Sequence, residues 1–187
     1  MILFASGNGT CRARPPNDYV GGVLRNAQLG TMWLDLLTPF EVCDAPLRAN
    51  IGLLSQRLGI VCDWLRRHGA TRDLPIGLFG AGDGATAALQ TGAALGDGSS
   101  SLAAIVSRGA RPDCTGTLGR ISAPTLLIVG GLDDGALGLN RAAYAAMRCK
   151  KRIEIVPGAT HDFEEPGSPE VVARLARSWF LRYAHRV

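Results

Sequence analysis

Residues 77–89, GLFGAGDGATAAL, join an apolar run to an alanine-rich stretch through a cluster of glycines. A strand–turn–helix corner of this kind can carry an exposed nucleophile, in the pattern G-x-S-x-G. It can also bring a pyrophosphate close to the backbone, in the pattern G-x-G-x-x-G/A. Gly82 stands where the first pattern has its serine. The second pattern fits Gly80, Gly82 and Ala85, but alone it is weak evidence, and here it follows the third expected strand instead of the first.

Two further residues carry groups that can move or orient a proton. His161, in PGATHDFEEP, has an imidazole, which titrates near neutral pH and suits a general base. Asp133, in VGGLDDGAL, could fix the tautomer of that imidazole and stabilise its cation. Each residue also has a structural interpretation, because the histidine could bond neighbouring carboxylates and GLDDG is a good turn sequence. Both interpretations stay open at this point.

The secondary structure that must position these residues follows from alternating apolar runs and helical patterns. Continuously apolar strands separated by helices indicate a parallel sheet covered on both faces. We expect an irregular segment from the second strand to Pro46. The expected strands are 2–5, 31–37, 74–79, 102–107, 124–130 and 152–156. The expected helices lie around 18–28, 50–69, after 84, near 139–147 and over 172–183.

Ligands of open α/β sheets bind outside the carboxyl ends of the strands. The candidate site is therefore built from the residues that follow each strand: 6–9, 82–84, 108–111, 133–134 and His161. Arg108 and Arg111 could clamp a carboxylate or phosphate through paired N–H donors. Alternatively, one of them pairs with Asp113 and the other bonds a loop carbonyl. If this edge binds a ligand, we expect an anionic small molecule.

Without a side chain at position 82, catalysis would need another nucleophile. Asp83 fits a corner shifted by one residue and could form an ester intermediate that His161 helps to hydrolyse. Cys11 and Ser6 lie on the first expected loop and could face the same crevice. Water activated by the pair of Asp133 and His161 is a further route.

Several segments, in order over nearly the whole chain, resemble the dienelactone hydrolase-like branch of the α/β-hydrolases. They read LFASGNG, LDLLTP, LPIGLFGAGDGATAAL, IVSRGARPD, APTLLIVGGLDD and RIEIVPGATHDFEEPG. The resemblance implies that Asp133 and His161 correspond to the acid and base of that family. Gly82 takes the place of its Ser or Cys nucleophile and does not match. Ser6 and Gly7 stand at the oxyanion loop, where relatives usually read His-Gly.

The resemblance implies a three-layer α/β-hydrolase fold. Because the sequence begins at the strand that carries the first loop, we expect the antiparallel strands with which relatives commonly start to be missing. Its mostly parallel six-stranded sheet would have the order 2-1-3-4-5-6, with helices on both faces. It also implies kinship with ester or lactone hydrolases, with catalysis impaired by Gly82 and a small-molecule crevice retained. Strand 31–37 would then lie at the edge of the sheet. Because an apolar edge promotes pairing and aggregation, we expect either a homodimer through it or a monomer that tends to aggregate.

Length and composition bound the remaining expectations. The 187 residues suit one domain over 1–187. The net charge is +4, but the arginines are scattered and aromatic residues make up only 6%, so nucleic-acid binding is unsupported. Five cysteines without a C-x-x-C pair favour free thiols and a cytoplasmic location over a disulfide framework or a zinc site. The apolar run at the N-terminus is too short to span a membrane, and no cofactor or metal is expected.

Overall fold

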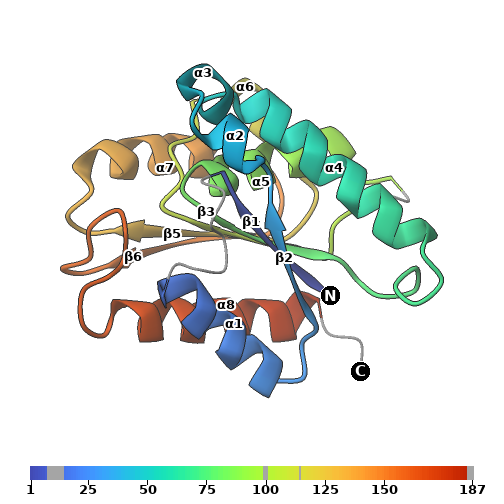
Figure 1. The fold of residues 1–187 in the computed structure, drawn as a ribbon. Coiled ribbons are helices and arrows are strands. Elements are labelled where there is room, and N and C mark those ends of the chain that lie inside the picture. Colours follow the sequence, from blue (N-terminus) through green and yellow to red (C-terminus); the bar gives the residue numbers. More distant parts are fainter. Residues whose placement is uncertain (8–14, 99–100, 114, 185–187) are drawn as a thin grey trace.

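The computed structural model describes residues 1–7, 15–98, 101–113 and 115–184. Six parallel strands form one sheet in the order β2-β1-β3-β4-β5-β6, which confirms the predicted order. The strands are β1 (Ile2–Ser6), β2 (Thr31–Asp35), β3 (Gly77–Ala81), β4 (Ala104–Arg108), β5 (Thr125–Gly130) and β6 (Lys151–Val156). Figure 1 shows the sheet between two layers of helices.

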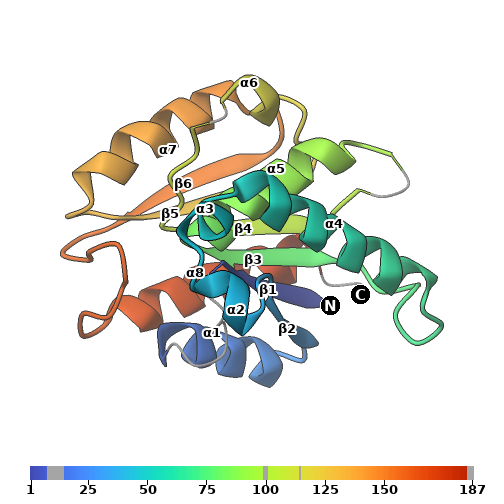
Figure 2. The same cartoon turned by 45° about the horizontal axis from the view of Figure 1, so that its top comes forward.

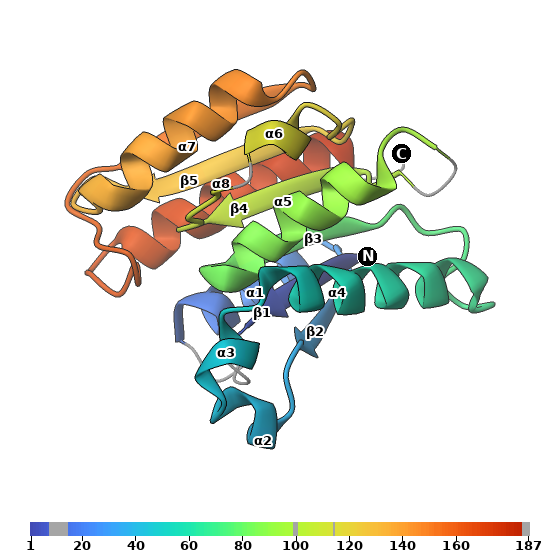
Figure 3. The ribbon, with the colours of Figure 1, turned by 90° about the horizontal axis from the view of Figure 1, so that it is seen from above.

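The helices are α1 (Pro15–Asn26), α2 (Pro39–Val42), α3 (Ala45–Arg48), α4 (Ile51–Arg67), α5 (Asp83–Leu95), α6 (Thr115–Leu118), α7 (Asp134–Ala146) and α8 (Ser168–Tyr183). Helices α1 and α8 pack together on one face of the sheet. Helices α4, α5 and α7 cover the other face, and Figure 3 shows them lying over the strands with α8 beneath. None of the helices described has the length and apolar character needed to cross a bilayer.

Burial explains why the central strands are almost continuously apolar. Strands β1, β4 and β5 are buried along their whole length, because helices cover both of their faces. The two outer strands, β2 and β6, are partly exposed. On the α1 and α8 face, the ring of Phe4 packs against Trp33 and Phe79, with centroids 4.2 and 4.8 Å apart. Leu54 and Leu58 of α4 are fully buried on the other face.

Several element boundaries differ from the sequence-based expectation. The segment expected to be irregular contains α2 and the first residues of α3, and Figure 2 shows both short helices near the start of α4. Helix α2 begins with a capping box, in which Thr38 and Glu41 satisfy each other's backbone N–H groups. Arg57 of α4 then holds both carboxylate oxygens of Glu41, at 2.6 and 2.7 Å. Helix α6 was not expected, and α7 begins at Asp134, earlier than its apolar pattern indicates.

Candidate functional site at the carboxyl edge of the sheet

The corner between β3 and α5 has the backbone conformation of a sharp strand-to-helix turn. Gly82 lies at its apex with φ +57° and ψ −122°, a region that residues with a side chain adopt only with strain. Its N–H donates to the carbonyl of Arg108 at 3.0 Å. Its own carbonyl accepts from the N–H groups of Ala85 and Thr86 at 3.0 and 3.2 Å. These bonds fix the apex between the neighbouring strand and the first turn of α5.

The two glycines that flank the apex are required by close approach of the backbone. A Cβ atom at Gly80 would lie 2.4 Å from the Cα of Ala85, and one at Gly84 would lie 2.2 Å from the carbonyl oxygen of Ala5. Gly82 differs from both. A Cβ atom at Gly82 would lie 3.7 Å from Nε2 of His161, which is an ordinary contact distance. This is the nearest described atom outside Gly82 and its two neighbours in the chain.

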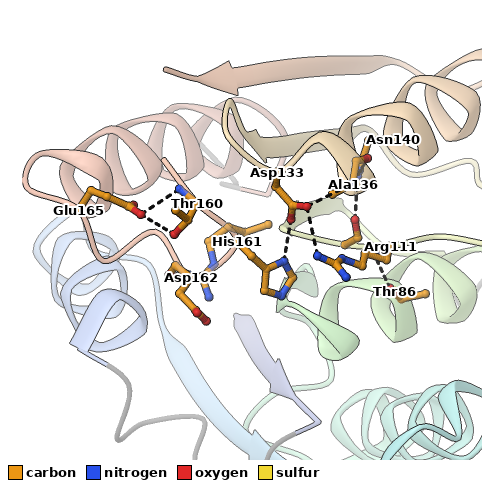
Figure 4. A network of polar contacts seen from close by, with 11 residues as sticks. Thr86, Arg111, Asp133, Ala136, Asn140, Thr160, His161, Asp162 and Glu165 are labelled. Carbon is orange, nitrogen blue, oxygen red and sulfur yellow. Dashed lines mark hydrogen bonds and ion pairs between the residues drawn. The ribbon is translucent and has the colours of Figure 1, made fainter. Parts of the chain in front are cut away.

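Asp133 and His161 lie together on the same edge, as Figure 4 shows. Asp133 follows β5, and His161 lies in the loop between β6 and α8. Nδ1 of His161 is 3.0 Å from Oδ2 of Asp133. With a proton on Nδ1, the imidazole donates to the carboxylate and presents the lone pair of Nε2 toward Gly82.

The carboxylate of Asp133 serves two structural purposes at once. Its Oδ1 accepts from the N–H of Ala136 at 3.2 Å and so caps α7. The same Oδ1 also accepts from Nη2 of Arg111 at 3.1 Å. Burial raises the pKa of Asp133, but the N–H of Ala136, His161 and Arg111 outweigh it, so the pKa lies below its ordinary value of 3.8. Asp133 is therefore ionised at neutral pH.

The loop that carries His161 is held by contacts with Arg108. Nη1 of Arg108 donates to the carbonyl of Asp162 at 3.0 Å, and its guanidinium lies 5.2 Å from the ring centre of Phe163. Phe163 is fully buried and has a positive φ of 58°. These contacts place the imidazole relative to the end of β4.

Arg108 and Arg111, which the sequence suggested as a clamp for an anion, have different partners in the structure. Arg108 is buried and bonds a loop carbonyl, whereas Arg111 pairs with Asp133 and not with Asp113. The N–H of Arg111 also donates to the hydroxyl of Thr86 at 3.3 Å. Asn140 of α7 donates to the carbonyl of Ala110 at 2.7 Å, which fixes the loop after β4 from its other side. Figure 4 shows the carboxylate of Asp133 between His161 and Arg111.

A pocket of about 140 Å³ opens beside the apex of the corner. Gly82, Asp83, His161, Arg108 and Ser6 contribute to its lining, whereas Arg111 does not. The Cβ position of Gly7 lies 3.1 Å from the Cβ of Asp83, so the first loop contacts the start of α5. Cys11 lies outside the described residues.

Two lining residues, Asn17 and Asp162, were not singled out from the sequence. Asn17 is 1% exposed and lies on the buried side of α1 among apolar residues. A polar residue on an otherwise apolar helix face was the sequence signal that could have identified it. Asp162 directly follows His161 in the sequence. In the part of the chain that the structure describes, no group of three or more His, Cys, Asp or Glu side chains could hold a metal ion.

Comparisons with known proteins identify solved structures that share the fold of this chain. A dienelactone hydrolase from Anabaena variabilis has 43% sequence identity and a TM-score of 0.91, and the match covers 98% of this chain and 86% of that one. The esterase Est1E from Butyrivibrio proteoclasticus matches with a TM-score of 0.78, covering 97% of this chain and 86% of the other. At 11% identity, Est1E shows the fold alone. No family model matches the chain.

A curated protein of Mycobacterium tuberculosis is also similar. It is named "Putative phosphoribosyl transferase Rv0571c" and is 47% identical over 182 residues, which make up 97% of this chain. The chain spans only 40% of the length of that relative.

Proposed function

We propose that this chain, which belongs to the dienelactone hydrolase-like family of α/β-hydrolases, binds a small ester or anionic molecule but forms no acyl-enzyme. In α/β-hydrolases the corner between strand and helix carries the nucleophile, followed along the chain by the acid and then by the histidine. Gly82, Asp133 and His161 occur in that order. The proposal assigns them to these three positions, with glycine replacing the nucleophile.

The observation that carries the proposal is the distance between the Gly82 corner and the imidazole. An activated serine needs its oxygen within hydrogen-bond reach of the base, about 2.6–3.2 Å. The Cβ position of Gly82 is 3.7 Å from Nε2 of His161, which suits a hydroxyl placed one bond further out. Glycine has only hydrogen there, so the base has no side-chain oxygen from this corner to activate. Loss of the nucleophile in a hydrolase triad lowers turnover by about 10⁶-fold.

The pocket beside Gly82 supports binding of an ester or anion. Arg108 belongs to its lining, and α5 begins at Asp83, where helix geometry directs N–H groups outward. Both features favour a carboxylate or a polarised carbonyl oxygen.

The alternative function is an active ester or lactone hydrolase with a different nucleophile. Asp83 is exposed and lines the pocket, but its Oδ2 lies near the first loop, 3.8 Å from the Cβ position of Gly7. Ser6 is a buried lining residue at the end of β1. Cys11 remains a third candidate. Neither Asp83 nor Ser6 lies at the apex of the corner, which is why we favour the first proposal.

The name phosphoribosyl transferase belongs to a relative that extends well beyond the match. We propose that this name refers to the part of that protein outside the matched 182 residues. Asp133 and His161 can move a proton, and an acyl transfer reaction requires that step.

Pre-steady-state kinetics with p-nitrophenyl acetate test the absence of an acyl-enzyme. We expect no burst of p-nitrophenolate from the wild type and a burst proportional to enzyme concentration from Gly82→Ser. A wild-type burst, with an acetyl group mapped to Asp83, Ser6 or Cys11, would establish the alternative. Binding is tested separately, by following the backbone amide signals of Gly82 and Asp83 while butyrate is added. Unchanged signals would contradict the binding part of the proposal.

A further inference from the structure

We infer that a water molecule beside Gly82 acts as the nucleophile, with His161 as its general base, so that the chain hydrolyses activated esters in one step without a covalent intermediate. This inference rests on the proposed function, because it requires that Gly82 replaces the nucleophile and that no other side chain is acylated. It goes further in assigning an activity to the site.

The corner at Gly82 has room for a water molecule. Replacing a serine by glycine removes both Cβ and Oγ from the side of the corner that faces the imidazole. Among the described atoms beyond its own surroundings in the chain, only Nε2 of His161 lies within 4 Å of the Cβ position of Gly82. Gly82 and His161 both line a pocket of about 140 Å³, whereas a water needs roughly 10–15 Å³ on the same kind of measure.

The imidazole of His161 is held by a carboxylate that suits it to act as a base. The Nδ1 side of His161 is bound at 3.0 Å to the carboxylate of Asp133, which is 6% exposed. That carboxylate is ionised at neutral pH and is held by Ala136 and Arg111 as well. A fixed anion on Nδ1 stabilises the imidazolium that forms when Nε2 takes a proton. The pair is thus arranged for general base catalysis whether the proton comes from a serine or from water.

The developing oxyanion has a backbone donor at the start of α5. In this fold, the N–H of the residue after the nucleophile position contributes to the oxyanion hole. Here that residue is Asp83, the first residue of α5, whose N–H has no acceptor within the helix. The positive end of the helix dipole adds to the stabilisation of negative charge at this point.

The reaction balances without any further reagent. The water oxygen bonds to the ester carbonyl carbon while one water proton moves to Nε2 of His161. The carbonyl oxygen becomes an oxyanion near the N–H of Asp83. When it collapses, the bond between carbon and the leaving oxygen breaks, and Nε2 returns the proton to that oxygen. The products are the carboxylic acid and the alcohol.

The experiment compares steady-state hydrolysis of p-nitrophenyl acetate by the wild type with that by two alanine variants. Gly82→Ala places a methyl group where the water would sit. Gly96→Ala is the matched control, since Gly96 at the other end of α5 has φ +58° and ψ −141° and open space around its Cβ position. The variant His161→Gln removes the base. Circular dichroism and thermal melting establish that each variant is folded.

We expect slow wild-type turnover that Gly96→Ala leaves unchanged and that Gly82→Ala and His161→Gln each lower by about 10²–10⁴-fold, the usual contribution of a general base. Intact mass after acid quenching should show no acetylated protein. If the wild type binds butyrate but shows no turnover above buffer, or if Gly82→Ala retains full turnover, the inference is wrong while the proposed function survives. If acetylated wild-type protein accumulates, the proposed function itself fails.

Discussion

The guanidinium of Arg111 contacts the carboxylate of Asp133, with 3.1 Å between Nη2 and Oδ1. The arginine side chain is 58% exposed and the aspartate only 6%. A surface cation therefore shares a nearly buried carboxylate with the imidazole of His161, which uses the other oxygen. This sharing connects the loops after β4, β5 and β6 into one network at the candidate site.

Removal of the Arg111 charge should have a small and salt-dependent effect on stability. Since its side chain is largely solvated, we expect Arg111→Gln to lower the free energy of unfolding by about 0–1 kcal/mol at neutral pH. The loss should shrink as ionic strength rises from about 0.01 to 1 M, because the ion pair is screened. Urea denaturation at several salt concentrations measures this loss in the free energy of unfolding. Arg141→Gln, on the exposed side of α7, is the control, and an equal loss in both variants would contradict the prediction.

The lowered pKa of Asp133 predicts how stability depends on pH. A carboxyl whose folded pKa lies below its ordinary value stabilises the protein above that ordinary value, and the contribution is lost as pH falls through the folded pKa. Asp133→Asn keeps an oxygen that can cap α7 but removes the charge. We expect the wild type to be more stable than this variant near neutral pH, with the difference shrinking as the pH falls below 3.8. Urea midpoints measured across that range test this, and a pH-independent difference would contradict it.

Gly82 and Gly84 of the corner should differ in their tolerance of alanine. A Cβ at Gly84 meets the fixed carbonyl oxygen of Ala5 at 2.2 Å, so we expect Gly84→Ala to lower the free energy of unfolding by about 3 kcal/mol or more. Gly82→Ala has room and carries only backbone strain, about 1–3 kcal/mol. Chemical denaturation of both variants gives the order. Equal losses would mean that the close approach of α5 to β1 is not the constraint.

The homodimer through β2 stays a prediction. Strand β2 is an outer strand of the sheet, and Met32, Trp33 and Leu34 on it are only partly buried. Such an edge can pair with a second copy. We expect light scattering to show a dimer whose fraction rises with protein concentration. A single monomer mass at every concentration would contradict the prediction.

The sequence was sufficient for the framework of this site. Apolar strands bounded by glycine and aspartate located the carboxyl edge, and the resemblance supplied the order of the strands. The corner at Gly82 and the loops of Asp133 and His161 follow from these two facts, because parallel strands end at the same edge.

The sequence alone could not predict which side chains pair with one another. Asp113 is nearer than Asp133 to Arg111 in the sequence, but the loop after β4 is fixed by Thr86 and Asn140 in a position that directs the arginine to Asp133. The short helices α2 and α3 were missed although Thr38 and Glu41 carry the capping-box signal, because four-residue helices have too few positions to show a period.

The most direct test of the central claim is covalent labelling by a fluorophosphonate, which reacts with a serine that a neighbouring base activates. We predict that wild-type protein stays unlabelled and that Gly82→Ser is labelled at position 82, as shown by intact mass and peptide mapping. Adding His161→Gln to Gly82→Ser should abolish the label. Labelling of the wild type at any residue of the pocket, or a Gly82→Ser variant that is folded but unreactive, would contradict the claim that His161 faces a corner from which only the nucleophile is missing.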